Sequence, residues 1–210
     1  MSNTAPELEM RFRADMGEGL GEMFSLLWGD TLILHRNWHE FVELFGTDQR
    51  HFEIMNDAAG DFFRIVQDAL LHVILMHICC LSDSSRKAER VSLWRIPDLA
   101  STMKEELTPL LEDVKRKTVF ARDWRNRLFA HKDLKLALGT SPKPLESASR
   151  ESIRSAIAAI DRVLQAVEAH YRGSGTSFDL GNVTGGAEDL LEVLTNGLSA
   201  AKDLAPGEPI

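Results

Sequence analysis

The sequence predicts an all-α protein, organised as a bundle of four or five long helices with a short C-terminal helix. Apolar residues recur every three or four positions through most of the 210 residues, as they do on one face of a helix. No segment alternates apolar and polar residues as a half-buried strand does, and no internal repeat is evident. With 44% hydrophobic and 27% charged residues, the chain has the composition of a soluble globular protein.

The first 22 residues are expected to form a loosely ordered N-terminal segment. They carry mixed charge without a clear period, and Gly17, Gly19 and Gly21 discourage a helix there. A first long helix is predicted from Met23 onward, and Gly46 ends it. Its apolar stripe consists of Met23, Leu27, Leu34, Trp38, Phe41 and Phe45.

A second long helix is expected to begin near Asp48 and to end before Ser82. Gly60 lies inside it, so we predict a break or bend at that point. Beyond Val73 the segment is apolar nearly all round, which indicates a central, buried helix. Its most apolar run, residues 69–81, contains histidines and is too short to span a bilayer.

The third helical region begins after a polar loop at 82–96, where Pro97 can open a helix at its first turn. Thr108-Pro109 predicts a kink or a restart, after which a helical stripe continues to His131. The loop at 132–146 then connects to an amphipathic helix, which Gly173 ends. The apolar face of that helix consists of Ile153, Ile157, Ile160, Leu164, Val167 and Tyr171.

These elements define three parts of the chain. Residues 1–22 are the loose N-terminal segment, residues 23–172 are the helical domain, and residues 173–210 are a flexible link with a short helix at 187–198.

A basic cluster lies at the end of the third helical region. Residues 115–135 hold eight lysines and arginines against two aspartates, a local balance of +6 in a chain whose formal net charge is −8. Clustered cations repel one another, so a basic island in an acidic protein indicates an anionic partner. The pI of about 5.4 confines any nucleic-acid contact to such a patch.

The cluster has the side chains needed to cleave RNA by its own 2′-OH. Arg122, Arg125 and Arg127 can each present a fixed fork of donors to a phosphate. His131 can both take and give a proton near neutral pH. Arg127 and His131 would share a helix face, whereas Arg125 and His131 lie on adjoining faces. This chemistry needs no metal and no cofactor.

The cluster also resembles a known family signature. Arg125-Asn126, followed after four residues by His131, is similar to the Arg-polar-x-His signature of the HEPN superfamily, and residues 125–133 resemble its abortive-infection (Abi-U type) branch. Leu44-Phe45-Gly46 and Leu81-Ser82-Asp83, which end the first two helices, agree with that branch. The resemblance covers roughly residues 24–170.

The resemblance implies a metal-independent endoribonuclease that acts in phage defence or as a toxin. It implies a homodimer in which the Arg/His sets of two subunits face each other across one cleft. In that arrangement Arg125 stabilises the phosphate, Asn126 positions it and His131 moves protons. RNA is then the expected partner, and a toxin would also have an antitoxin. The backbone of the RNA would be held by Arg122, Arg127 and Lys132, with Trp124 stacking a base.

Three other interpretations remain open. Cationic side chains at a helix end are also stabilised by the helix dipole, and Trp124 is most simply a core residue. A non-catalytic HEPN-like module could use the same cleft to bind a nucleotide or a protein. His35, His39 and Glu43 recur every four residues on the first helix, a spacing that could hold zinc in a metal-dependent hydrolase.

The two cysteines bear on the compartment. Cys79 and Cys80 are adjacent in an apolar run, and two buried thiols indicate a reducing compartment. No signal peptide is evident in the first residues. The sequence therefore predicts a cytoplasmic protein without a membrane partner.

Overall fold

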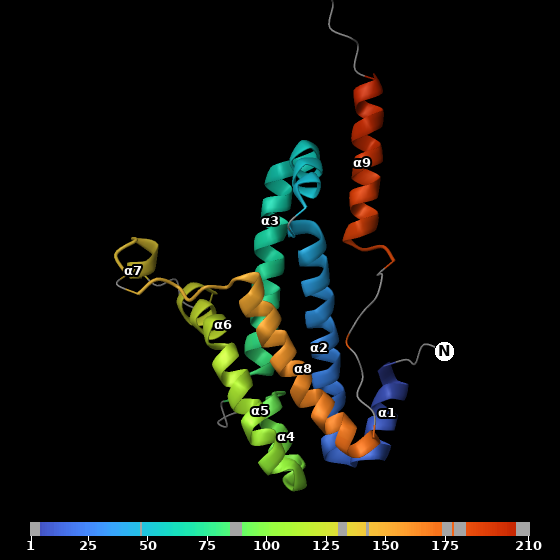
Figure 1. Ribbon diagram of the computed structural model, residues 1–210, viewed down its shortest axis with the longest axis vertical. Helices are drawn as coiled ribbons and strands as arrows, with labels where there is room; N and C mark the ends of the chain where they lie inside the picture. Colours follow the sequence, from blue (N-terminus) through green and yellow to red (C-terminus); the bar gives the residue numbers. More distant parts are fainter. Residues whose placement is uncertain are drawn as a thin grey trace, which may run out of the picture. The chain divides into compact units, whose positions relative to one another are not determined.

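Helices are the only regular secondary structure that the described residues form, which confirms the predicted all-α class. The computed structural model describes residues 5–46, 48–84, 90–129, 134–141, 143–173, 178 and 184–204. Its long helices are α2 (Glu18–Phe45), α3 (Gln49–Leu81), α5 (Lys104–Lys117), α8 (Arg150–Arg172) and α9 (Ala187–Leu204) (Figure 1). The shorter elements are α1 (Ala5–Met16), the 3₁₀ turn η1 (Leu93–Arg95), α4 (Ile96–Leu99), the 3₁₀ turn η2 (Ser101–Met103), α6 (Val119–Trp124), the π-helical turn η3 (Arg125–Phe129) and α7 (Leu134–Ala137).

The chain divides into two compact units. Unit 1 comprises Met1–His35 and Leu75–Phe178, and unit 2 comprises Arg36–Ile74 and Asp179–Ile210. Both α2 and α3 contribute residues to each unit. The predicted domain at 23–172 therefore contributes to both units.

The core of unit 1 is built around the packing of α8 on α5 (Figure 1). Ser149 caps the start of α8 by accepting a hydrogen bond from the Ser152 backbone N–H at 3.1 Å, and Gly173 ends the helix with φ +67°. Five of the six residues of the predicted stripe of α8 are buried, whereas Tyr171 is partly exposed, and each buried side chain stabilises the fold by about 1.5–3 kcal/mol. The buried residues of this helix pair include Leu107, Leu111, Val114, Ile153, Ile157, Ile160, Leu164 and Val167.

The N-terminal segment differs from the prediction, because residues 5–16 form helix α1 and α2 already begins at Glu18. Phe12 of α1 is buried, with its ring 4.8 Å from the ring of Phe24. Gly21 allows the close approach of the two helices, since a Cβ there would lie 2.5 Å from backbone atoms of Arg13. The glycine-rich start is thus a packing feature of a helix, and the prediction of a loose segment was wrong for these residues.

Helix α3 carries the predicted break. Ala59, directly before Gly60, has non-helical angles (φ −169°, ψ 65°) inside the helix. The later residues Ile74, Leu75 and Ile78 are fully buried, as predicted. Earlier in the helix, by contrast, Phe62, Ile65 and Val73 are exposed apolar side chains.

By length and composition, α3 could cross a membrane. Its most apolar window has a mean hydropathy of 1.5, and 28% of that window is buried in the protein. A core helix of a soluble protein meets the same two criteria, so one such helix is weak evidence for a membrane span. Of the two thiols at its end, Cys79 is buried as predicted, whereas Cys80 is exposed.

Helix α9 belongs to unit 2 and begins at Ala187, as predicted, but continues to Leu204. The Ala187 backbone N–H donates to Oε2 of Glu40 at 2.6 Å, so a carboxylate of α2 caps the first turn of α9. Ala187 and Leu191 are buried in this unit.

Candidate functional site

The described part of the basic cluster lies on the end of α5, on α6, on the π-helical turn and on α7, not on the single helix that the sequence predicts. Helix α5 continues through Pro109, so the predicted restart does not occur there, and the helix ends at Lys117. Thr118 (φ −103°, ψ 9°) separates it from α6, and its Oγ1 donates to the Val114 carbonyl at 2.8 Å. The following π-helical turn, Arg125–Phe129, begins at the first residue of the predicted signature. Such turns are rare and recur at functional sites.

Arg122 is held inside unit 1. Its Nη1 donates to Thr118 Oγ1 at 2.7 Å and to Ser82 Oγ at 3.3 Å, and its Nη2 donates to the Lys115 carbonyl at 2.5 Å. Burial lowers the pKa of Arg122, and the nearby Arg125 lowers it further. The guanidinium of Arg122 therefore uses both terminal nitrogens to join the end of α3 to the end of α5. Fewer of its donors are left for the predicted phosphate contact.

Arg127 is also bonded within the chain. Its Nη2 donates to the Lys143 carbonyl at 2.7 Å and to Ser141 Oγ at 2.9 Å, and its Nη1 donates to the Pro144 carbonyl at 3.2 Å. Asp123, one turn earlier, accepts from the same Nη1 at 3.4 Å. Arg127 thus joins the π turn to the segment that leads into α8.

Trp124 packs at the same place. Its Nε1 donates to the Glu146 carbonyl at 2.7 Å, and its ring lies 6.1 Å from the ring of Phe129. The indole N–H is bonded to the backbone of another segment, so the ring has a structural role. The stacking of this ring on a base stays a prediction.

Arg125 and Asn126 differ from these neighbours. Arg125 Nε donates to Asn126 Oδ1 at 3.0 Å, and no other hydrogen bond or ion pair of this guanidinium occurs within the described ranges. Arg125 is partly exposed and Asn126 is exposed. Two terminal nitrogens of Arg125 are therefore available for an oxyanion, with an amide beside them.

The other two predicted site residues, His131 and Lys132, lie in the segment 130–133, outside the described residues.

The chain was compared with known protein families. The HEPN AbiU2 family, described as AbiU2, matches residues 17–193. The chain belongs to this family. The match confirms the resemblance to the HEPN superfamily and its Abi-U type branch, and it extends beyond the residues on which that resemblance was recognised. No curated protein and no solved structure matches the chain.

In this AbiU2 protein the carboxyl end of α3 lies against the arginines of the cluster, a contact that the charge pattern does not predict. Ser82 contacts Arg122, and both Arg122 and Arg125 act electrostatically on Cys79. Burial nevertheless raises the pKa of the Cys79 thiol to about 11, so the thiol stays protonated near neutral pH. The stretch Leu81-Ser82-Asp83 was part of the family resemblance, and it was the only signal for this contact.

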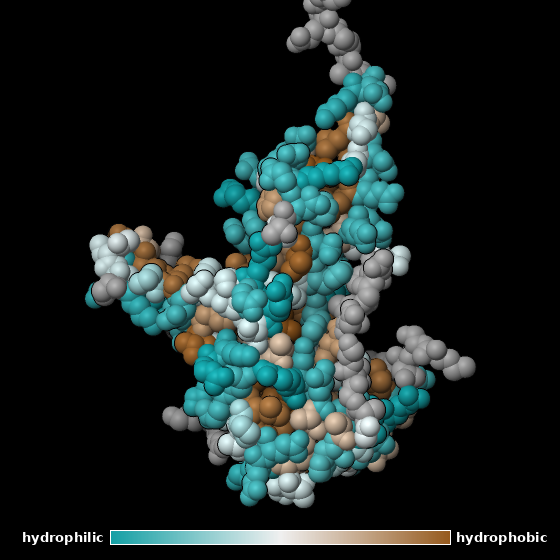
Figure 2. Space-filling model, viewed as in Figure 1, coloured by the Kyte–Doolittle hydropathy of each residue, from teal (hydrophilic) through white to brown (hydrophobic). Residues whose placement is uncertain are grey.

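A hollow of about 440 Å³ lies next to the cluster, between α5, α6 and the start of α8. Arg116 and Lys117 line it on one side, and Glu146 and Glu151 also reach it, so its charge is mixed. Exposed apolar side chains lie over the neighbouring α7 (Figure 2), where Leu134 and Leu138 are both exposed.

The proposed zinc site lacks support from the geometry. No group of three His, Cys, Asp or Glu side chains close enough to hold a metal occurs among the residues that the structure describes. His35 Nε2 instead lies 2.8 Å from Asp161 Oδ1, and its ring stacks on Phe178.

Proposed function

We propose that the protein is a metal-independent endoribonuclease of HEPN type, with Arg125, Asn126 and His131 as its reactive set. The observation that carries the proposal is the contrast among three arginines of one cluster. Arg122 and Arg127 are bonded to the protein through their terminal nitrogens, whereas the hydrogen bond of Arg125 within the described residues is made by Nε, to Asn126. Membership of a HEPN family supports the same assignment.

In the proposed reaction the 2′-oxygen of the RNA attacks the adjacent phosphorus, and the bond from phosphorus to the 5′-oxygen breaks. The imidazole of His131 from one subunit removes the proton from the 2′-OH. The protonated imidazole of His131 from a second subunit gives a proton to the leaving 5′-oxygen. Arg125 stabilises the charge that develops on the phosphate oxygens, and Asn126 orients both. The products are a 2′,3′-cyclic phosphate and a 5′-OH.

A homodimer supplies the second imidazole. The signature of one chain holds a single histidine, and acid–base cleavage proceeds better when two histidines share the roles. If both subunits contribute, the activity of mixtures of wild type and His131→Ala should fall with the square of the wild-type fraction. A linear fall contradicts the shared site.

The biological role proposed with this activity is abortive infection: the enzyme acts in the cytoplasm on cellular or phage RNA and stops growth. A toxin of this kind requires restraint until infection, so an antitoxin is the proposed protein partner. Membership of the AbiU2 family supports this role.

The test compares Arg125→Ala and His131→Ala with wild type on a labelled RNA. Each substitution should lower the cleavage rate by about 10²–10⁴-fold, as is typical for loss of a proton-transfer or charge-stabilising group. EDTA should leave wild-type cleavage unchanged, and the fragments should carry 2′,3′-cyclic phosphate and 5′-OH ends.

Arg64→Ala is the matched control. It removes the same charge from an exposed position on α3, outside the basic cluster, where Arg64 pairs with Asp61. This variant should cleave RNA like wild type. If His131→Ala cleaves as well as wild type, or if wild type binds RNA without cutting it, the nuclease proposal is wrong, and the second result supports the non-catalytic binding module.

A further inference from the structure

The segment that returns the chain to α8 is fastened to the candidate site. We call Ser141 and residues 143–146 the strap. Arg127 alone binds three of its groups: Ser141 Oγ and the carbonyls of Lys143 and Pro144. Figure 1 shows the chain passing from α7 across the end of α6 to the start of α8.

Two consecutive residues of α6 hold the end of the strap. Asp123 Oδ2 accepts from the Glu146 backbone N–H at 3.0 Å, and Trp124 Nε1 donates to the Glu146 carbonyl at 2.7 Å. Asp123 therefore accepts a hydrogen bond directly from the strap. Through its 3.4 Å contact with Nη1 it also orients Arg127. The side chains of Asp123 and Arg127 are 15% and 17% exposed, so little water competes for this pair.

The contacts with the strap are made by residues on both sides of the two residues that the proposed reaction uses. Asp123, Trp124 and Arg127 flank Arg125 and Asn126 on both sides in the sequence, and all three are bonded to the strap. A π turn is rare within helices and is found often at functional sites. Since the π turn begins at Arg125, the contacts of Asp123, Trp124 and Arg127 with the strap hold the backbone on both sides of this residue.

We propose that Asp123 is a positioning residue: through Arg127 and the strap it holds the π turn that presents Arg125 and Asn126 to the phosphate. This inference rests on the proposed endoribonuclease function. Asp123 does not touch the RNA in this scheme. Its loss should lower the rate of the chemical step more than the affinity for RNA, because small misplacements of a catalytic group lower rates by up to about 10²-fold.

The test is Asp123→Asn, which keeps an oxygen for the Glu146 N–H but removes the charge that attracts Arg127. The expected result is a fall in kcat of about 10–100-fold with KM changed by less than about threefold. Fluorotryptophan NMR supplies a readout that does not depend on activity. The Trp124 resonance, assigned with Trp124→Phe, should shift in Asp123→Asn because the indole bonds to the strap.

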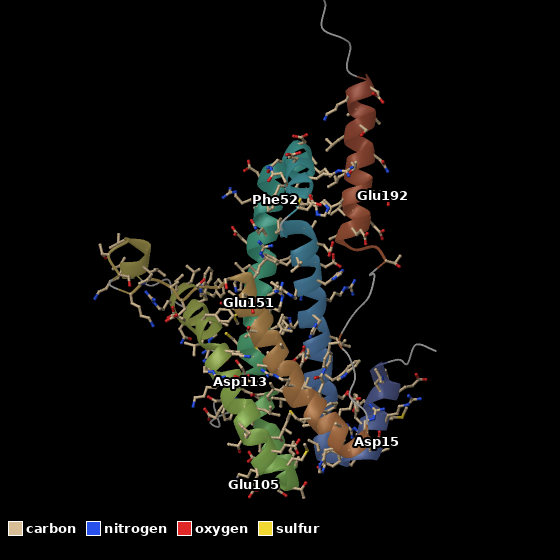
Figure 3. The ribbon with its side chains drawn as sticks, viewed as in Figure 1. Asp15, Phe52, Glu105, Asp113, Glu151 and Glu192 are labelled. Atoms are coloured by element: carbon tan, nitrogen blue, oxygen red, sulfur yellow. The ribbon has the colours of Figure 1, made fainter. Side chains whose placement is uncertain are left out.

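Asp113→Asn is the matched control. Asp113 lies on the side of α5 that faces α8 (Figure 3), is 16% exposed like Asp123, and pairs with Arg116, Lys117 and Arg162 but not with the strap. It should keep wild-type kcat and an unshifted Trp124 resonance. If Asp123→Asn does not fold, Arg127→Lys tests the same contacts, since lysine keeps the charge but lacks the second terminal nitrogen and the planar fork with which Arg127 binds the strap.

The outcomes separate the two proposals. If cleavage does not depend on Arg125 and His131, the proposed function fails, and the positioning role fails with it. If cleavage depends on both residues but Asp123→Asn and Asp113→Asn have the same kcat, the positioning role alone is overturned. An unshifted Trp124 resonance in Asp123→Asn also overturns it, whatever the kinetics show.

Discussion

Arg125 is oriented by its own neighbour: its Nε donates to Asn126 Oδ1 at 3.0 Å, while the terminal nitrogens stay available. An amide accepts this hydrogen bond without neutralising the guanidinium. A carboxylate at the same position would accept it too, but it would pair with the charge that the phosphate requires. The identity of residue 126 therefore controls how much of the Arg125 charge reaches a ligand.

We predict that Asn126→Asp weakens RNA binding more than Asn126→Ala does. The aspartate adds a negative charge beside the phosphate and pairs with Arg125, whereas alanine only releases Arg125 from its orientation. Fluorescence anisotropy on a His131→Ala background, where the RNA stays intact, should give a Kd about tenfold higher for the aspartate variant at low salt.

Asn196→Asp on α9 controls for net charge, because it makes the same chemical change at an exposed position outside the cluster. Its RNA affinity should stay within about twofold of the parent. Equal weakening by both aspartates would mean that RNA responds to the net charge of the protein and not to the local pair.

Alanine substitutions of Arg122 and Arg125 should differ in their effect on stability. Arg122→Ala removes the donor for Thr118 Oγ1, Ser82 Oγ and the Lys115 carbonyl, at a cost of about 1–3 kcal/mol. In a chain of this length that corresponds to a fall in Tm of several degrees. Arg125→Ala leaves only one side-chain amide without its partner, so its Tm should stay near that of wild type.

Salt dependence separates the same two residues in binding. If Arg125 contacts a phosphate, Arg125→Ala should reduce the slope of log K against log [salt] by about 1. A stable Arg122→Ala protein, or an Arg125→Ala protein with an unchanged slope, would contradict the division between a structural and a ligand-binding arginine.

The sequence predicted what depends on local signals. The helix α8 was recognised from its apolar period and from Gly173, because both act within the segment itself. Gly21 was misread, because a glycine that breaks a helix and one that admits a neighbouring helix look alike until Arg13 is seen beside it. Local charge likewise could not show which arginines are bonded within the protein. Arg122 bonds to Ser82, which lies 40 positions earlier in the chain.

Asp113 gives the expected dependence of stability on pH. Burial raises the pKa of its carboxyl, but Lys117, Arg116 and Arg162 lower it more, so the pKa lies below the ordinary value of 3.8. The native state therefore binds the proton less tightly than the unfolded chain does. The resulting stability is fully present above about pH 4–5 and disappears as the pH falls through the lowered pKa.

Asp113→Asn should accordingly have a lower Tm than wild type between pH 6 and pH 8, by an amount that does not change with pH, and the two curves should converge in acid. Differential scanning calorimetry at a series of pH values measures this directly. A difference that grows as the pH falls below about 4 would show that the sign of the pKa shift is wrong.

Two glycines of α2 should give opposite results when changed to alanine. At Gly21 the new Cβ would lie 2.5 Å from backbone atoms of α1, so the helices must separate and the buried contact between Phe12 and Phe24 is disturbed. At Gly29 no atom lies within 4 Å of the Cβ position, so alanine gains helix propensity of about 0.5–1 kcal/mol without a clash. Thermal unfolding should therefore show a lower Tm for Gly21→Ala, by several degrees, and a slightly higher Tm for Gly29→Ala. Limited proteolysis should cut α1 first in Gly21→Ala. If both variants shift Tm in the same direction, α1 does not pack on α2 through Gly21, and residues 5–16 are loosely attached after all.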